Sequence, residues 1–480
     1  MLALPERAVQ FGTGAFLRGF VDYFLDVANA SQQFNGRVVA IGSTGSGRER
    51  AFTDQDGLYT LVSRGITRGA SSDERRLIAS VSRVLSAATE WEAVLACARN
   101  PALTTIFSNT TEVGITFDAD DQFDASPPAS FPAKLTRFLF ERARAFDFDD
   151  AHDVIVVPCE LIAQNGAQLR AIVDRYTALW RLDKRFIAWL DSSTTFCNTL
   201  VDRIVPGTPA GADAELLADE MGYRDDLLTT AEHFRQFVIE GPPELRERLG
   251  FVTDDAGIII ARDIEPYRQR KVRLLNGAHS ISVATALLCG CATVHDAMTH
   301  PGVRAFIRRV LLDDIVPTLD VPDADRFARS VLERFENPFI RHALFDITLH
   351  GTAKLRVRLV PTVVRAAQLR GAVPDALAFG FAAHLFFLRG DLQRRRIVAG
   401  QQVPPDELGG RIHAAWAATP DADRIALHTM VRSVLSDADM WGEDLSQLPT
   451  FTDAVALHLS RIVRLGADRA LGTLLTAALP

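Results

Sequence analysis

The chain has 480 residues, a formal net charge of −8 at pH 7 and a pI near 5.8. A single hydrophobic core seldom organises so long a chain, so we expect two domains. The acidic balance, without a long run of lysines and arginines, argues against nucleic acid or an anionic membrane surface as a partner. Apolar stretches such as 281–294 are too short for a membrane span, and the N-terminus does not resemble a signal peptide. We therefore expect a cytoplasmic protein.

The first half of the chain alternates short β-branched runs with amphipathic segments of helix length, which predicts βαβ units around a parallel sheet. We expect an α/β, Rossmann-like, doubly wound dinucleotide-binding domain over residues 1–263. The expected strands are 8–11, 37–41, 104–108, 154–158 and 257–261, and the expected helices are 16–28, 90–98, 132–145 and 167–180.

Past residue 263 the alternation stops, and apolar residues recur at three- and four-residue spacing. Pro266 is typical of a helix start at a domain boundary. This pattern predicts a mostly α-helical substrate and catalytic domain over residues 264–480. Its expected helices include 303–311, 324–334, 355–369, 374–388 and 422–435.

The first expected strand leads directly into a glycine turn, Gly12-Thr-Gly14, at the start of a helix. Two such glycines let the backbone approach a pyrophosphate, whose charge is favourable at the N-terminus of a helix. The third glycine of the usual pattern is absent, because residue 17 is Leu17. A tight turn without a ligand therefore remains an alternative.

The residues that follow two further strands are relevant to which cofactor binds and where it binds. Residues 42–44 follow the second strand without the carboxylate that an NAD ribose usually meets, so this pattern does not separate NAD from NADP. Ser43 or Thr44 could accept a ribose hydroxyl of NAD, whereas Arg48 and Arg50 could bind the 2′-phosphate of NADP. After the third strand, residues 108–114 form a polar cluster at the carboxyl end of a parallel strand, where such sheets bind ligands, although a helix cap explains it equally well.

Only four of the 52 basic residues are lysines, and one of them opens the stretch 271–280. Lysine, unlike arginine, can give up its proton. On an α-helix, at about 100° per residue, Asn276 lies about 140° and His279 about 80° from Lys271, so one cleft could hold all three. The amine would act as acid or base, the amide as a donor to the reacting oxygen, and the imidazole as an orienting group. The alternative is a solvated lysine, a capping asparagine and a core histidine.

Several motifs together resemble the mannitol dehydrogenase, or polyol-specific long-chain dehydrogenase, family over nearly the whole chain. The most specific is the spacing of Lys271, Asn276 and His279 within residues 270–279. The other motifs are residues 10–19, 55–60, 107–112, 132–137, 158–162, 200–204 and 237–242.

The resemblance implies an NAD(H)-linked oxidoreductase that reduces a keto-sugar acid, here a keto-hexuronate, without a metal. Lys271 resembles the general acid/base of the family, Asn276 and Asn165 the amides that hold the reacting oxygen, and His279 a ligand of a substrate hydroxyl. By local pattern alone, Asn165-Gly166 is a turn and Asp202-Arg203 an ion pair or cap. The resemblance instead makes Asp202 and Lys354 substrate-binding residues. The expected cofactor-binding residues are Gly12, Gly14, Phe16, Arg18, Ser43, Ser108, Asn109, Thr110 and Glu112.

The chain departs from mannitol-type members at Glu160-Leu161, where those have Asp-Asn, and at residues 345–347, where those have an arginine. Both departures weaken the case for a polyol. They leave Arg268, Arg341 and Lys354 as candidates to bind a hexuronate carboxylate. Activity on fructuronate or fructose remains an alternative, as does an NAD-binding sensor without turnover. A metal-dependent lyase or epimerase has no clustered ligands to support it, and the sequence sets no oligomeric state.

Overall fold

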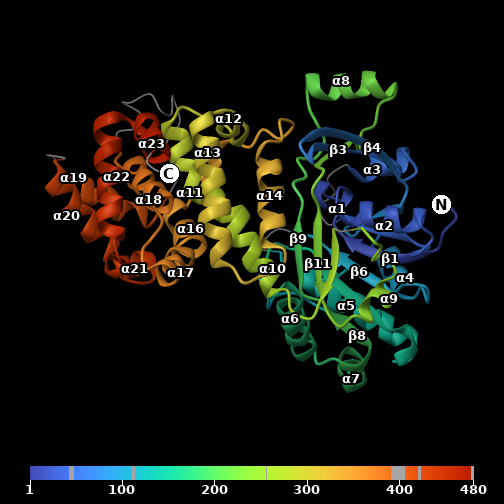
Figure 1. Cartoon of the computed structure of the whole chain (residues 1–480). Helices are drawn as coiled ribbons and strands as arrows, with labels where there is room; N and C mark the ends of the chain where they lie inside the picture. Colours follow the sequence, from blue (N-terminus) through green and yellow to red (C-terminus); the bar gives the residue numbers. More distant parts are fainter. Residues whose placement is uncertain (43–47, 111–113, 256, 391–405, 420–422, 477–480) are drawn as a thin grey trace. The chain divides into compact units, whose positions relative to one another are not determined.

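The structure is a computed structural model that describes residues 1–42, 48–110, 114–255, 257–390, 406–419 and 423–476. It divides into two compact units, Met1–Ile264 and Glu265–Pro480 (Figure 1). The first unit is α/β and the second is built of helices, as the sequence predicts.

The centre of the first unit is a six-stranded sheet in the order β5-β2-β1-β6-β7-β8. All its neighbouring strands are parallel. The order reverses direction between β1 and β6, which is the switch point where doubly wound sheets bind ligands. Its strands are β1 Glu6–Phe11, β2 Arg37–Gly42, β5 Val81–Ser86, β6 Thr105–Ser108, β7 Val154–Pro158 and β8 Thr194–Phe196.

Both faces of this sheet are buried, because alternate residues of each strand belong to two different cores. On β1, Ala8 packs into one core with Phe24 and Phe107, whereas Val9 packs into the other with Trp91 and Phe138. Such burial on both sides explains why the four inner strands β2, β1, β6 and β7 are largely apolar. The helices of this unit are α1 Ala15–Arg18, α2 Val21–Ala30, α3 Arg48–Asp54, α4 Trp91–Ala98, α5 Phe131–Ala145, α6 Asn165–Leu179, α7 Lys184–Ser193, α8 Ala212–Met221 and α9 Leu245–Leu249.

Two expectations for this unit are wrong in detail. The helix expected over 16–28 is broken into α1 and α2 at Gly19, where a Cβ atom would lie 2.8 Å from Val205. The strand expected over 257–261 is β12 Ile258–Ala261, which belongs to a separate three-stranded sheet. The two small sheets contain β3 Tyr59–Thr67, β4 Ala70–Ile78 and β10 Thr229–Glu232, and β9 Thr199–Asp202, β11 Gln236–Glu240 and β12.

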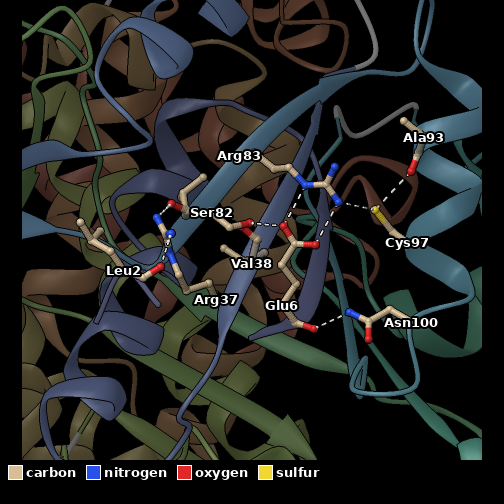
Figure 2. Close-up of polar contacts among 10 residues, drawn as sticks. Leu2, Glu6, Arg37, Val38, Ser82, Arg83, Ala93, Cys97 and Asn100 are labelled. Carbon is tan, nitrogen blue, oxygen red and sulfur yellow. Dashed lines mark hydrogen bonds and ion pairs between the residues drawn. The ribbon is translucent and has the colours of Figure 1, made fainter. Parts of the chain in front are cut away.

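The amino ends of the parallel strands are tied together by charged side chains (Figure 2). Arg83 on β5 donates two hydrogen bonds, of 2.8 and 2.9 Å, to the carboxylate of Glu6 on β1. Asn100 donates to the backbone carbonyl of Glu6 at 2.8 Å. Arg37, which opens β2, donates to the carbonyls of Leu2 and Val81. These side chains therefore bind polar groups of neighbouring strands at this edge of the sheet.

The second unit surrounds α18 Asp375–Phe387, in which every residue from Ala376 onward is buried. The helix expected over 355–369 is two helices, α16 Gly351–Arg358 and α17 Val360–Arg370, because Pro361 cannot continue a helical hydrogen-bond ladder. The others are α10 Glu265–Arg270, α11 Ala278–Leu288, α12 Val294–Thr299, α13 Pro301–Arg309, α14 Ala324–Phe335, α15 Leu344–Ile347, α19 Gly409–Ala417, α20 Arg424–Leu435, α21 Ala438–Trp441, α22 Phe451–Leu465 and α23 Ala467–Thr476. Within the described ranges, no helix combines the length and apolarity needed to cross a bilayer.

Candidate active site

The glycine turn after β1 has two glycines with different requirements. Gly12 has φ +134°, and a Cβ atom there would lie 2.9 Å from Leu17 and 3.2 Å from the carbonyl oxygen of Asn109, so only glycine fits. Gly14 has φ −67°, which any residue adopts, and no heavy atom in the described part of the chain lies within 4 Å of its missing Cβ. Neither conformation nor packing within the described residues requires glycine at position 14, whereas a closely bound ligand would.

Phe16 and Arg18 support this turn from inside the unit. Phe16 is half-buried and stacks on Phe20, with 4.9 Å between ring centroids. Arg18 is buried, and its guanidinium donates to Thr229 Oγ1 at 2.9 Å and to the carbonyl of Thr13, within the turn, at 2.8 Å. Direct cofactor contact by either residue stays a prediction. Ser43 and Glu112 lie outside the described residues.

A buried carboxylate, Glu160, organises the polar cluster after β6. It accepts hydrogen bonds from Ser108 Oγ at 3.1 Å and from the backbone N–H and hydroxyl of Thr110 at 3.0 and 3.2 Å. Asn109 donates to the carbonyl of Cys159 at 2.7 Å. Burial raises the pKa of Glu160, and the hydrogen bonds from Thr110 and Ser108 oppose this effect. Because β6 borders the switch point, this cluster shapes the ligand-binding edge of the sheet.

Asn165 is fully buried at the start of α6 and binds protein groups with its whole amide. Its NH₂ group donates to the carbonyls of Pro158 and Glu160 and to the hydroxyl of Thr199, and its oxygen accepts from the backbone N–H of Thr199 at 2.9 Å. Gly166 is required for the same crossing, because a Cβ atom would lie 2.3 Å from the carbonyl oxygen of Cys197. Glycine at position 166 is therefore required for chain packing. The hydrogen bonds of the Asn165 amide fit a positioning role better than direct contact with a reacting oxygen.

Asp202 is buried at the end of β9, opposite Gln236 of β11. The adjacent Arg203 is also buried and donates to the carbonyls of Gly19 and Glu232 and to the hydroxyl of Ser63. Burial lowers the pKa of Arg203 to about 10. A role for Asp202 in substrate binding stays a prediction.

In the helical unit, residues Lys271–Gly277 form a π-helix between α10 and α11. The angles expected from α-helical geometry are therefore wrong for this stretch. Hydrogen bonds in a π-helix join residues i and i+5, so residue 276 lies about one turn above residue 271. This geometry brings Asn276 closer to the face of Lys271 than an α-helix would. Both side chains are half-buried, and π-helical segments occur frequently at functional sites.

Gly277 closes this segment against the end of α16. A Cβ atom at Gly277 would lie 3.3 Å from Leu359 and 3.6 Å from the carbonyl oxygen of Arg358. A glycine within a helix suggests that another group lies close to its backbone. At Gly277 that group is the end of α16 in the same unit. Ser280, three residues on, donates to the carbonyl of Asn276 at 2.9 Å and accepts a hydrogen bond from Arg358 at 3.0 Å.

His279 packs between aromatic rings. Its ring centroid lies 4.1 Å from that of Phe335 and 5.2 Å from that of His342. Burial, followed by the positive charges of neighbours that include His342, lowers the pKa of His279 well below its usual value. His279 is therefore neutral near neutral pH, when an imidazole can both donate and accept a hydrogen bond.

Lys354 lies on α16, whose first turn is held in place by buried groups. Thr352 donates from its backbone N–H to the carboxylate of Asp406 at 2.8 Å, and its hydroxyl lies 3.0 Å from His384 Nε2. The amine of Lys354 donates to the carbonyl of Ile347 at 3.1 Å. Burial and then the neighbouring Arg358 lower the pKa of Lys354, and Asp406 opposes them.

Two of the residues that the sequence offered for a carboxylate are poorly suited to it. Arg268 already pairs with Glu265 at 2.6 Å, and Arg341 is exposed. In the described part of the chain, no group of three or more His, Cys, Asp or Glu side chains is suited to a metal ion. Sequence reasoning missed the roles of Glu160 and Arg358. The spacing of Arg358, four residues after Lys354 on one helix, is the signal that could have found it.

The switch-point sheet with its glycine turn, followed by a helical unit with a lysine and an amide on a π-helix, defines a two-unit dehydrogenase. Two family models match the chain, the mannitol dehydrogenase Rossmann domain over residues 6–251 and the mannitol dehydrogenase C-terminal domain over residues 263–463. The chain therefore belongs to the mannitol dehydrogenase family, which agrees with the NAD-linked oxidoreductase that the resemblance implies.

Individual proteins agree with this assignment. The chain is 41% identical to an altronate oxidoreductase of Klebsiella pneumoniae, over 96% of this chain and 95% of the relative. It is 39% identical to an altronate oxidoreductase of Bacillus subtilis, over 97% and 95%. A solved mannitol 2-dehydrogenase of Pseudomonas fluorescens shares the fold at 24% identity with a TM-score of 0.67, over 99% of this chain and 96% of that one. A D-sorbitol dehydrogenase does so at 24% identity with a TM-score of 0.76, over 98% and 95%.

Proposed function

We propose that this chain is an NAD-dependent reductase that converts the keto-hexuronate tagaturonate to altronate, and that it also catalyses the reverse oxidation. The observation that carries the proposal is the π-helical segment, which brings the amide of Asn276 towards the face of Lys271. The altronate oxidoreductases that share about 40% identity with the chain support the choice of substrate.

In the direction of reduction, NADH held by the first unit would supply the hydride that the carbonyl carbon receives. Lys271 donates a proton to the carbonyl oxygen, which becomes the new hydroxyl group, and Asn276 donates a hydrogen bond to the same oxygen. In the reverse direction the neutral amine of Lys271 accepts this proton. His279, which is neutral, holds a substrate hydroxyl.

The glycine turn and the switch-point cluster would hold NAD. Gly14 fits a close ligand because no described atom lies near its missing Cβ, and Gly12 brings the turn against Asn109. Ser108 and Thr110 would be oriented towards the cofactor by Glu160. Ser43 and Glu112 remain proposed contacts from the family pattern.

The proposal is tested by following NADH oxidation with tagaturonate, fructuronate and fructose side by side. We expect tagaturonate to have the highest kcat/KM. A higher value for fructuronate or fructose would assign the sister activity, and NADH binding without turnover on any of the three would assign a nucleotide sensor.

Variants of Lys271 test its role. Lys271→Ala should lower kcat by at least roughly 100-fold, the lower range of general acid catalysis, and leave the Kd for NADH unchanged. Lys271→Arg should be nearly as inactive, since arginine does not give up its proton. The matched control is Lys184→Ala, because Lys184 is an exposed lysine on α7 of the other unit. Unchanged turnover in Lys271→Ala would contradict the mechanism.

A further inference from the structure

Positive side chains gather around His279 in the helical unit. Lys354 and Arg358 are four residues apart on α16, which places them on one face of the helix. Besides burial and His342, the positive charges of Arg334, Arg358 and Lys354 all lower the pKa of His279. The region therefore holds several cations close to the residues proposed to bind the substrate.

Arg358 is half-buried, and its partner in the described residues is a neutral hydroxyl. Its single hydrogen bond is to the hydroxyl of Ser280, and among the described residues no carboxylate lies within ion-pair distance of its guanidinium. Burial lowers its pKa. A guanidinium has five N–H donors, so most of the donors of Arg358 are left for another acceptor. A half-buried charge with only a neutral partner is costly, and an anionic ligand would offset this cost.

The position of Arg358 is fixed by the segment that carries Lys271 and Asn276. The one proton of the Ser280 hydroxyl goes to the carbonyl of Asn276, so the oxygen is free to accept from Arg358. Two hydrogen bonds therefore link the guanidinium to the backbone of Asn276. This arrangement holds Arg358 near the proposed catalytic residues. Because its partner is a neutral hydroxyl and not a carboxylate, the positive charge of Arg358 is not neutralised by that partner.

Asp406 is an acidic residue near Lys354, but its carboxylate is bound by other groups. Asp406 opposes the lowering of the pKa of Lys354, but its carboxylate accepts three hydrogen bonds, two from Thr352 and one from the backbone N–H of Gly409. Asp346 acts similarly on His342 and forms no ion pair within the described ranges. Acidic side chains therefore lie near the start of α16, whereas the charge of Arg358, at its end, has no acidic partner in the described residues.

We propose that Arg358, together with Lys354, binds the carboxylate of the hexuronate substrate and of its aldonate product. The inference rests on the proposed function, because only a sugar acid brings such a carboxylate. A guanidinium suits this role because its planar fork matches both oxygens of a carboxylate. Arg358 would then distinguish sugar acids from neutral keto-sugars such as fructose.

The test is calorimetric titration of enzyme saturated with NADH, which cannot oxidise the added alcohol. The two probes are altronate and D-altritol, the same carbon chain with a neutral hydroxymethyl group in place of the carboxylate. Arg358→Met should weaken altronate binding roughly 100-fold, the effect of losing a charged hydrogen-bond pair, and leave altritol binding unchanged. Arg358→Lys should recover part of the loss. The control is Arg356→Met, because Arg356 is exposed on the same helix and donates to the carbonyl of Asp439.

Other results would overturn the inference. Wild-type affinity for altronate in Arg358→Met would remove Arg358 from the carboxylate site, and an equal loss for altritol would indicate a structural role. A loss confined to NADH would assign the cations to a cofactor phosphate. With tagaturonate as substrate, Arg358→Met should raise KM far more than it lowers kcat. Failure of the proposed function is a separate result, because the wild-type enzyme would then prefer fructuronate or fructose to tagaturonate, or would bind NADH without turnover.

Discussion

The two edges of the parallel sheet use polar side chains in opposite ways. At the amino edge, long charged side chains join the strands. Arg37 of β2 donates to a backbone carbonyl of β5, Arg83 of β5 donates to the carboxylate of Glu6 on β1, and Arg142 donates to backbone carbonyls of the segments that lead into β6 and β7. At the carboxyl edge the chain instead has glycines and short polar side chains, held by Glu160 and Asn165. At the amino edge the side chains of the protein bind one another and the backbone, whereas the carboxyl edge is shaped to accept a ligand.

The largest effect that we expect at the amino edge follows from Arg142→Leu. The buried guanidinium of Arg142 donates to the backbone carbonyls of Ala98, Asn100, Leu103 and His152. The carbonyl of Asn100 also accepts from the backbone N–H of Leu103, so leucine would remove the donor bound by the other three carbonyls, at a cost of about 1 kcal/mol or more each, and urea unfolding should show a loss of about 3 kcal/mol. The exposed Arg144 on the same helix is the control, and Arg144→Ala should change stability by less than about 0.5 kcal/mol. A loss below about 1 kcal/mol in Arg142→Leu would break the comparison.

Behind the carboxyl edge, Asp22 gives the second largest effect, and it depends on pH. Burial raises the pKa of Asp22 to about 7. The hydroxyl of Tyr59 lies 2.9 Å from Asp22 and 2.8 Å from the carbonyl oxygen of Arg18. Because Tyr59 has one proton, both contacts are hydrogen bonds only when Asp22 is protonated. The folded state therefore keeps a proton that the unfolded state releases, and stability falls as pH rises from the unfolded pKa near 4 to about 7.

Asp22→Asn should remove this dependence, because the amide can donate to Tyr59 at any pH. Between about pH 5 and about pH 8, the wild-type protein should lose roughly 2 kcal/mol of stability relative to the variant. Thermal or urea unfolding across this range measures the difference. Asp54→Asn, at an exposed position on α3, is the control and should leave the pH profile unchanged. Parallel profiles for wild type and Asp22→Asn would show that Asp22 is ionised throughout.

At the carboxyl edge itself, the two glycines of the turn should separate binding from stability. Gly14→Ala should change the free energy of unfolding by less than about 0.5 kcal/mol and weaken NADH binding roughly tenfold, or about 1.4 kcal/mol. Gly12→Ala should lower both, because its φ of +134° and its contact with Asn109 exclude a Cβ atom. Fluorescence titration with NADH and urea unfolding measure the two quantities. Unaltered NADH binding in Gly14→Ala would remove the turn from the cofactor site.

The sequence predicts four strands of the parallel sheet, β1, β2, β6 and β7, because burial on both faces makes them apolar runs, as in β2 and β7. It misses the two edge strands β5 and β8, whose sequences VSRVLS and TTF are partly polar and only partly buried. It does not predict β4, whose residues are mostly exposed and charged, so that its pattern is that of a loop. The glycine turn and the spacing of Lys271 and Asn276 are local in sequence and were therefore accessible.

Other parts of the site depend on distant residues or on unusual helical geometry. The π-helix at 271–277 could not be predicted from angles that assume an α-helix. The burial of Asn165 depends on Thr199, 34 residues away in sequence. Arg358 resembles a solvated arginine at a helix end until Ser280 is placed beside it. Spacing thus selects candidate site residues, while tertiary contacts determine the partners and burial of each one.

The smallest effect should come from Glu6 at the amino edge. Although burial alone would raise it, hydrogen bonds from Arg83 and Ser82 hold the pKa of Glu6 below its usual value. Its stabilising contribution is therefore present above the unfolded pKa and is lost as pH falls through the folded value. Because the side chain of Arg83 is 47% exposed, water screens the pair, and Glu6→Gln should cost less than about 1 kcal/mol near neutral pH. The cost should shrink further in acid, and NADH binding should be unaffected. A larger cost, or weaker NADH binding, would mean that the two edges of the sheet are energetically coupled, so that the amino edge also supports the ligand site.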